Sequence, residues 1–274
     1  MTEHHFDTPR PVRLFTEIGK GKVSVAASDT AETHVRISGR DADEVDVRQD
    51  GDQISVVAPR QRGFFSGDNN RLDVVVELPT GSEVAVRTGS ADVTLTGTVG
   101  RAQLRSGSGD IEVDTAAGPL LVETGSGDIR IEEAHAELKA KSGSGDVLVV
   151  DAAATLMVST GSGDVQLWTT RAPVVVKTGS GDVKVGDAGT DVTMTTGSGD
   201  LVVSTARRGR LTAKGASGNV HVGVPAGVPV WTDISTVSGK IRSTLQGAGQ
   251  PEEGADHVEI RAKVVSGDIV LSQA

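Results

Sequence analysis

A glycine-rich segment that ends in aspartate recurs every 18 residues through the middle of the chain. It reads TGSGDVQL at residues 160–167, and close copies precede and follow it. The aspartate column of the repeat consists of Asp92, Asp110, Asp128, Asp146, Asp164, Asp182 and Asp200. A strict period of this length is typical of repeat proteins, in which each unit buries its apolar face only against its neighbours. The chain is therefore expected to stack many copies of one small unit.

Each repeat contains two stretches in which apolar and polar residues alternate. In one repeat, Val165 and Leu167 form the first apolar set, and Val174 and Val176 form the second. Alternation with a period of two is typical of a strand with one buried face. Lys177 and its equivalents fall between the apolar positions and mark an outer face. We therefore predict an all-β fold, a parallel β-solenoid of flattened, two-sided coils of 18 residues, with right-handed coiling as the default for parallel crossovers.

The two ends depart from the repeat. We expect a flexible tail over residues 1–10, irregular β coils or a cap over residues 11–87, and regular coils over residues 88–274. The segment 11–87 holds strand-like stretches without the GSGD corner, and a cap is needed because an open solenoid end exposes a strand edge. The stretch QGAGQPEEGADH, residues 246–257, is predicted to be an inserted surface loop.

The composition narrows the classes of function. The chain has no cysteine, which excludes disulfides, zinc–thiolate sites and a thiol nucleophile. Its formal net charge of −10 disfavours binding to nucleic acid or to anionic membranes. No apolar run approaches a membrane span, and the first residues lack the apolar core of a signal peptide. We therefore expect a soluble, cytoplasmic protein with no nucleic-acid or membrane partner.

The GSGD corner has a structural and a metal-binding interpretation. In the structural one, glycine supplies the positive φ of a tight turn, aspartate bonds turn amides, and the hydroxyls bond between coils. In the alternative, calcium relieves the repulsion between stacked carboxylates. Its candidate ligands are Asp110, Asp128, Asp146, Asp164, Asp182 and Asp200. The structural interpretation is preferred, because the known calcium β-roll repeats every nine residues and binds calcium at both corners. This chain has one aspartate corner every 18 residues. We therefore expect no metal or other cofactor, with calcium as the alternative.

A catalytic site is not expected. The histidines are scattered, and none falls on the GSGD corner, so its serines and aspartates lack a neighbouring base. Aromatic residues make up only 2% of the chain, which leaves few platforms for stacking sugars or bases. The sequence thus predicts a protein without catalytic or cofactor-binding residues.

One segment differs from the mixed-charge outer faces, namely RQRGFFSGDNN at residues 60–70. Phe64 and Phe65 are neighbours, so both cannot face inward on a strand, and Arg62 precedes them in an acidic protein. The segment either folds over the solenoid end as a cap or forms a hot spot for a protein partner or self-association.

The net charge of −10 also suggests an acidic mimic of nucleic acid as a third hypothesis. The lysines and arginines of the outer faces argue against it, because they interrupt a surface of negative charge.

The chain resembles the DUF4097 family, the bacterial "putative adhesin" β-strand repeat proteins. The likeness lies in VRLFTEIGKGKVSVAASD, in VVVELPTGSEVAVRTGSADV and in the serial TGSGDV units. The resemblance implies a β-solenoid and an adhesin-like label, and it brings no catalytic or binding residues with it. We therefore expect a non-enzymatic scaffold or protein-interaction module, with a calcium-binding solenoid as the alternative.

Overall fold

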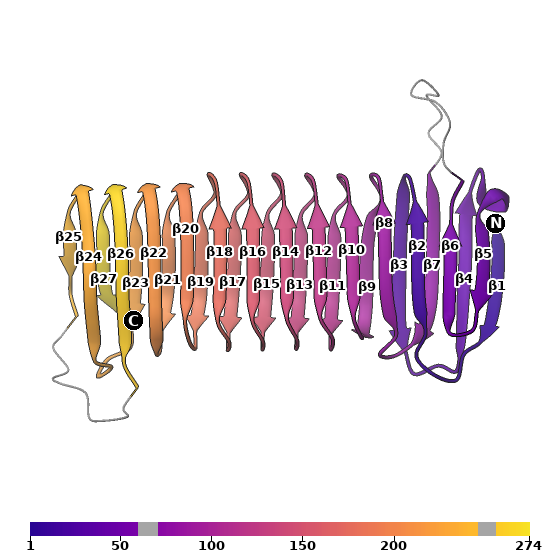
Figure 1. Ribbon diagram of the computed structural model, residues 1–274, viewed down its shortest axis with the longest axis horizontal. Coiled ribbons are helices and arrows are strands. Elements are labelled where there is room, and N and C mark those ends of the chain that lie inside the picture. Colours follow the sequence, from indigo (N-terminus) through magenta and orange to yellow (C-terminus); the bar gives the residue numbers. More distant parts are fainter. Residues whose placement is uncertain (60–70, 246–255) are drawn as a thin grey trace, which may run out of the picture. The chain divides into compact units, whose positions relative to one another are not determined.

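The computed structural model describes residues 1–59, 71–245 and 256–274 (Figure 1). The described residues form 27 strands and one short 3-10 turn, η1 (Ala42–Glu44). The chain divides into two compact units, Met1–Glu137 and Leu138–Ala274. Each unit consists of two sheets whose apolar faces form its core. The predicted all-β solenoid is confirmed, whereas the direction of coiling stays a prediction.

The first unit contains both parallel and antiparallel strands. In spatial order, its first sheet contains β1 (Thr2–Asp7), β4 (Glu32–Gly39), β7 (Leu72–Pro79), β3 (Gly21–Ser28), β9 (Asp92–Val99), β11 (Ile111–Ala116) and β13 (Ile129–Ala134). Its second sheet contains β5 (Asp46–Asp50), β6 (Gln53–Val57), β2 (Arg13–Ile18), β8 (Glu83–Thr88), β10 (Ala102–Ser106) and β12 (Leu120–Thr124). Strand β4 pairs antiparallel with both β1 and β7, and β5 pairs antiparallel with β6.

The second unit is built from parallel ladders. Its first sheet contains β15 (Val147–Ala152), β17 (Val165–Thr170), β19 (Val183–Ala188), β21 (Leu201–Ala206), β23 (Val220–Val224), β27 (Ile269–Gln273) and β25 (Ile241–Ser243). Its second sheet contains β14 (Leu138–Ser142), β16 (Leu156–Thr160), β18 (Val174–Thr178), β20 (Val192–Ser198), β22 (Gly209–Ser217), β26 (Val258–Ser266) and β24 (Val230–Ser238).

The register of the regular coils follows from the repeat. Residues 18 positions apart are paired, as Val165 is with Val183. Val165, Leu167, Val174 and Val176 are all buried, which confirms the predicted inner face of both strands. Stacking like residues over like keeps each apolar column continuous, so no single coil needs a core of its own.

The coils at the two ends do not follow chain order. In the first unit, β3 lies between β7 and β9, and β2 lies between β6 and β8. In the second unit, β26 lies between β22 and β24, and β27 lies between β23 and β25. The coil of residues 258–273 therefore fills an inner position, although residues 230–243 precede it in the chain. The inner-facing residues give the reason, because Val258, Ile260 and Ala262 are fully buried, whereas β24 has threonines in its inner column.

Two expectations about the ends change, and a third is not tested. Residues 1–10 were expected to be a tail, but β1 pairs with β4, which satisfies backbone groups that β4 would otherwise leave at a sheet edge. The predicted boundary at residue 87/88 lies inside the first unit, because β8 pairs with both β2 and β10. Most of the predicted loop 246–257 lies outside the described residues. Within the described ranges, no helix is long and apolar enough to cross a membrane.

Candidate functional site

The aspartate column forms a ladder of hydrogen bonds between coils. The Asp164 amide donates to Oδ1 of Asp146 at 2.8 Å, and the Asp182 amide donates to Oδ1 of Asp164 at 2.8 Å. In the first unit, the Asp128 amide donates to Oδ1 of Asp110 at the same distance. The aspartates were expected to accept hydrogen bonds from turn amides. They do so, but each donor amide belongs to the turn of the next coil. Each aspartate therefore fixes the spacing between two coils.

The same ladder continues through the end coils in their spatial order. The Asn219 amide donates to Oδ1 of Asp200 at 2.7 Å, and the Asp268 amide donates to Oδ1 of Asn219 at 3.0 Å. The Lys240 amide then donates to Oδ1 of Asp268 at 2.8 Å. Because Asn219 occupies one rung, a neutral carboxamide can make the bond as well as a carboxylate does.

A buried hydroxyl closes each corner from Gly109 to Gly181 from the inside. Oγ1 of Thr160 accepts from the Gly163 amide at 3.1 Å and donates to the carbonyl of Gly145, in the preceding coil, at 3.4 Å. Thr178 makes the equivalent bond to the Gly181 amide at 3.0 Å. These hydroxyls lie two residues before the serine of the GSGD corner, and they hold both the turn and the neighbouring coil.

The glycines of the regular corners serve a different purpose from the one expected. Gly127 and Gly163 do not have positive φ, so the predicted turn conformation is wrong for the regular coils. A Cβ atom on Gly163 would instead lie closer than 3.0 Å to the carbonyl oxygen of Gly145 in the preceding coil. Positive φ does occur at Gly199, Gly218 and Gly267, where the coils are less regular. In the regular corners, glycine is therefore required because the stacked backbones approach each other too closely for a side chain.

The column offers single bonds rather than a cage of ligands. Within the described ranges, no three of its aspartates bring carboxylate oxygens within 4.8 Å of one another. Calcium is usually held by six to eight oxygens. The contacts that the structure shows for the column are hydrogen bonds to backbone amides, and calcium stays the alternative.

The outermost coil of the second unit exposes apolar side chains. This terminal coil consists of β24 and β25, and among the described residues β24 has a partner strand on one side only, namely β26. Trp231 and Val237 on β24 are 71% and 84% exposed, and Val265 on the neighbouring β26 is 57% exposed. Such residues at a sheet edge mark a surface that can add a further strand.

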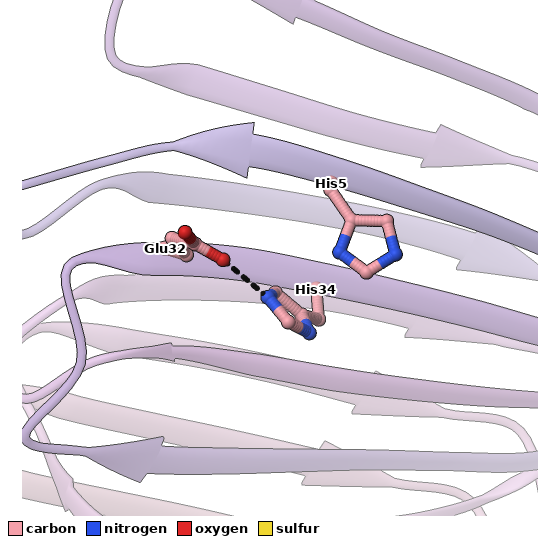
Figure 2. Close-up of side chains that lie close together, drawn as sticks. All are labelled: His5, Glu32 and His34. Carbon is pink, nitrogen blue, oxygen red and sulfur yellow. Dashed lines mark hydrogen bonds and ion pairs between the residues drawn. The ribbon is translucent and has the colours of Figure 1, made fainter.

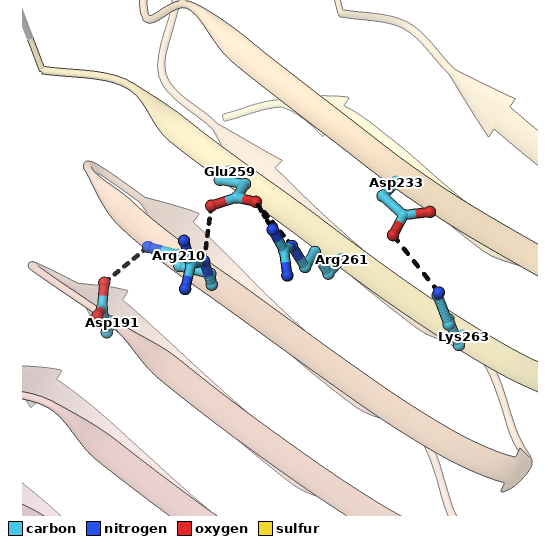
Figure 3. A network of polar contacts seen from close by, with 6 residues as sticks. All are labelled: Asp191, Arg210, Asp233, Glu259, Arg261 and Lys263. Carbon is cyan, nitrogen blue, oxygen red and sulfur yellow. Dashed lines mark hydrogen bonds and ion pairs between the residues drawn. The ribbon is translucent and has the colours of Figure 1, made fainter.

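Charged residues beside the terminal coil pair with one another (Figure 3). Nε of Arg210 lies 2.6 Å from Oε2 of Glu259, and Arg261 donates to the other carboxylate oxygen. Both hydrogen bonds hold the pKa of Glu259 below its usual range, and the bond from Arg210 has the larger effect. Lys263 pairs with Asp233 on β24 at 3.4 Å. Because these charges already have partners within the chain, the apolar side chains are the more available feature for binding.

The predicted partner-binding residues Arg62, Phe64 and Phe65 lie outside the described residues. The sequence did not indicate that residues 230–238 form a strand that ends a sheet. Trp168, the other tryptophan, is 61% exposed on β17 and does not cover the core. The terminal coil was missed because its edge position depends on the coil order.

A family model described as Toastrack DUF4097 matches residues 13–185 and 168–272. Comparison with curated proteins finds no match. Among solved structures, the chain is similar to a "putative lipid binding protein" from Parabacteroides distasonis, with 14% identity and a TM-score of 0.50 over 100% of this chain and 96% of that one. "Putative adhesins" from Parabacteroides merdae and Bacteroides fragilis are 11% and 12% identical, with TM-scores of 0.45 and 0.43, and the likeness covers 100% and 98% of this chain and 96% of each of those. At 14% identity, the first likeness shows a shared fold alone.

Proposed function

The chain belongs to the Toastrack DUF4097 family, and we propose that it is a non-enzymatic β-solenoid module that binds protein through its terminal coil. The observation that carries the proposal is the exposure of Trp231 and Val237 on an edge strand. Large exposed apolar residues are costly in water, and they are enriched in the binding surfaces of proteins. An edge strand adds backbone donors and acceptors that a second strand can pair with.

The partner that fits best is a second copy of the chain. A two-fold axis at Ile234 would place two copies of β24 antiparallel, with residue 231 of one strand opposite residue 237 of the other. Trp231 would then pack on Val237 of the second copy, and the reverse contact would form at the other end of the pair. Such a contact buries both exposed side chains and satisfies the edge of both sheets at once.

Light scattering over a concentration series tests this proposal. We expect the parent chain to dimerise as its concentration rises, and the double variant Trp231→Ser with Val237→Lys to stay monomeric. Both side chains are largely exposed, so the double variant should keep the parent melting temperature and circular dichroism spectrum.

The matched control is Trp168→Ser, which removes a similarly exposed tryptophan from β17. This variant should dimerise like the parent, which separates a specific edge contact from general stickiness of exposed aromatic residues. A parent chain that is monomeric at every concentration, or a double variant that dimerises normally, would show the proposal to be wrong.

A further inference from the structure

A second candidate site lies in the first unit, on the antiparallel ladder of β1 and β4. In this ladder, His5 is paired with His34 and Asp7 is paired with Glu32. Paired residues of an antiparallel ladder share one face of the sheet, and residues two positions apart along a strand share it too. Two imidazoles and two carboxylates therefore lie in a two-by-two array on the outer face of the sheet.

Three of these side chains converge (Figure 2). Nε2 of His34 lies 2.8 Å from Oε2 of Glu32, and the ring centroids of His5 and His34 are 4.3 Å apart with an interplanar angle of 69°. One ligand atom from each of His5, Glu32 and His34 lies within 4.8 Å of the others. Across the described residues, no other trio of histidine, aspartate or glutamate side chains meets this distance.

The surroundings of the trio carry negative charge. On the other side of β4, the register pairs His34 with Glu77 of β7, so a third carboxylate-bearing residue joins Asp7 and Glu32 next to the histidine pair. The nearest cation on the same face of β4 is Arg36, and its guanidinium Nε lies 2.9 Å from a carboxylate oxygen of Glu3. A divalent cation would therefore enter a locally acidic surface without displacing a bound arginine.

We propose that His5, Glu32 and His34 together bind a divalent transition-metal ion, with Zn²⁺ the best match to their chemistry. Two imidazole nitrogens and one carboxylate oxygen are the ligand set of many zinc sites that keep a fourth position open. Bond lengths to zinc are about 2.0–2.2 Å, so small side-chain rotations suffice to bring the three ligand atoms around one ion. Calcium and magnesium prefer sites made of oxygen alone, so this site differs in kind from the calcium alternative for the aspartate column.

A bound ion would cross-link two strands that are distant in sequence. His5 comes from the edge strand β1, whereas Glu32 and His34 both come from β4. Metal binding would therefore fasten β1 to the sheet and stabilise the backbone hydrogen bonds between β1 and β4. The inference concerns the first unit and is independent of the self-association proposed for the terminal coil.

Calorimetric titration of the chelator-treated full chain with zinc chloride tests the site. We expect saturable binding of one zinc ion per chain, and His5→Ala and His34→Ala should each weaken it about tenfold or more. The matched control is His135→Ala, because His135 lies 3.2 Å from Glu133 and thus repeats the histidine–glutamate pair without a second histidine. This control should bind zinc like the parent.

Cobalt gives a second measurement that does not depend on the variants. In the parent chain, Co²⁺ should produce visible absorption bands of a low-coordinate nitrogen and oxygen site, and zinc should remove them. Zinc should also slow proteolysis within residues 1–10 in the parent. The proposal is wrong if millimolar zinc gives no saturable heat and cobalt gives no such bands, or if both histidine variants bind zinc as tightly as the parent.

Discussion

Single residues of the corner hold neighbouring coils together. The Asp146 carboxylate accepts the amide of Asp164, and the Thr160 hydroxyl bonds to both its own turn and the preceding coil. Glycine at position 163 leaves the room that the carbonyl of Gly145 needs. The conspicuous GSGD motif is thus explained by the geometry of stacking, and the aspartate is one of three groups that act on the same contact.

The first prediction concerns Asp146. Asp146→Asn should keep the parent stability, because Asn219 already makes the equivalent bond in another coil. Asp146→Leu should cost about 1 kcal/mol or more, because the Asp164 amide loses its acceptor. Urea unfolding measures both values, and Glu112→Leu on an exposed outer position is the control.

Two results would contradict this prediction. Equal stability of the leucine variant and the parent would argue against a structural role for the aspartate. A melting temperature that millimolar calcium raises and a chelator lowers, with loss of the effect in Asp146→Asn, would favour the calcium alternative.

At the scale of the strand, alternation decides which side chains form the core. In β18, Val176 is fully buried against Val158 and Met194 of the neighbouring strands, whereas Lys177 is exposed on the outer face. Because like residues stack in register, one change on the inner face affects three coils, and one change on the outer face affects none of the core.

The second prediction compares these two neighbours. Val176→Asp should cost several kcal/mol, because it places an unpaired carboxylate in an apolar column. Lys177→Asp should be close to neutral, because both charges remain in water. Thermal unfolding of the two variants is the measurement, and equal destabilisation would overturn the assigned register.

At the scale of the whole molecule, the order of the coils differs from the order of the chain in both units. The coil of residues 258–273 lies one position inside the end of its unit, whereas in the coil of residues 13–28 strand β2 is third and strand β3 is fourth from the end of its sheet. Each is thus covered on both sides by segments that lie next to one another in sequence. This arrangement fastens the chain near each terminus and leaves the more polar coil, residues 230–243, at the outer position.

The third prediction tests that order. Ile260 on β26 is fully buried between β22 and β24, whereas Ile234 on β24 is partly exposed in the outermost coil. Ile260→Ala should therefore cost about 2–5 kcal/mol, and Ile234→Ala should cost less than about 2 kcal/mol. Urea unfolding compares the two, and a larger cost at Ile234 would mean that the coils follow chain order instead.

The amino-acid sequence by itself determined the solenoid, its 18-residue register and the inner and outer faces of the regular strands. It could do so because the repeat places equivalent residues such as Val165 and Val183 at a fixed interval, and only stacking buries them all. Strand-like segments before residue 88 were also recognised from alternation alone, and they correspond to β2 to β7.

Only the tertiary structure decided the order of the end coils, the true role of the corner glycines and the meeting of His5 with His34. These features rest on contacts between residues far apart in the chain, and such contacts leave no period in the sequence. His5 and His34 face each other because β1 pairs antiparallel with β4, and a shift of one residue in that register would put them on opposite faces. Likewise, β26 lies between β22 and β24 because its inner residues are more apolar than those of β24. The two strands compete for this position only in the folded chain, where both can reach it.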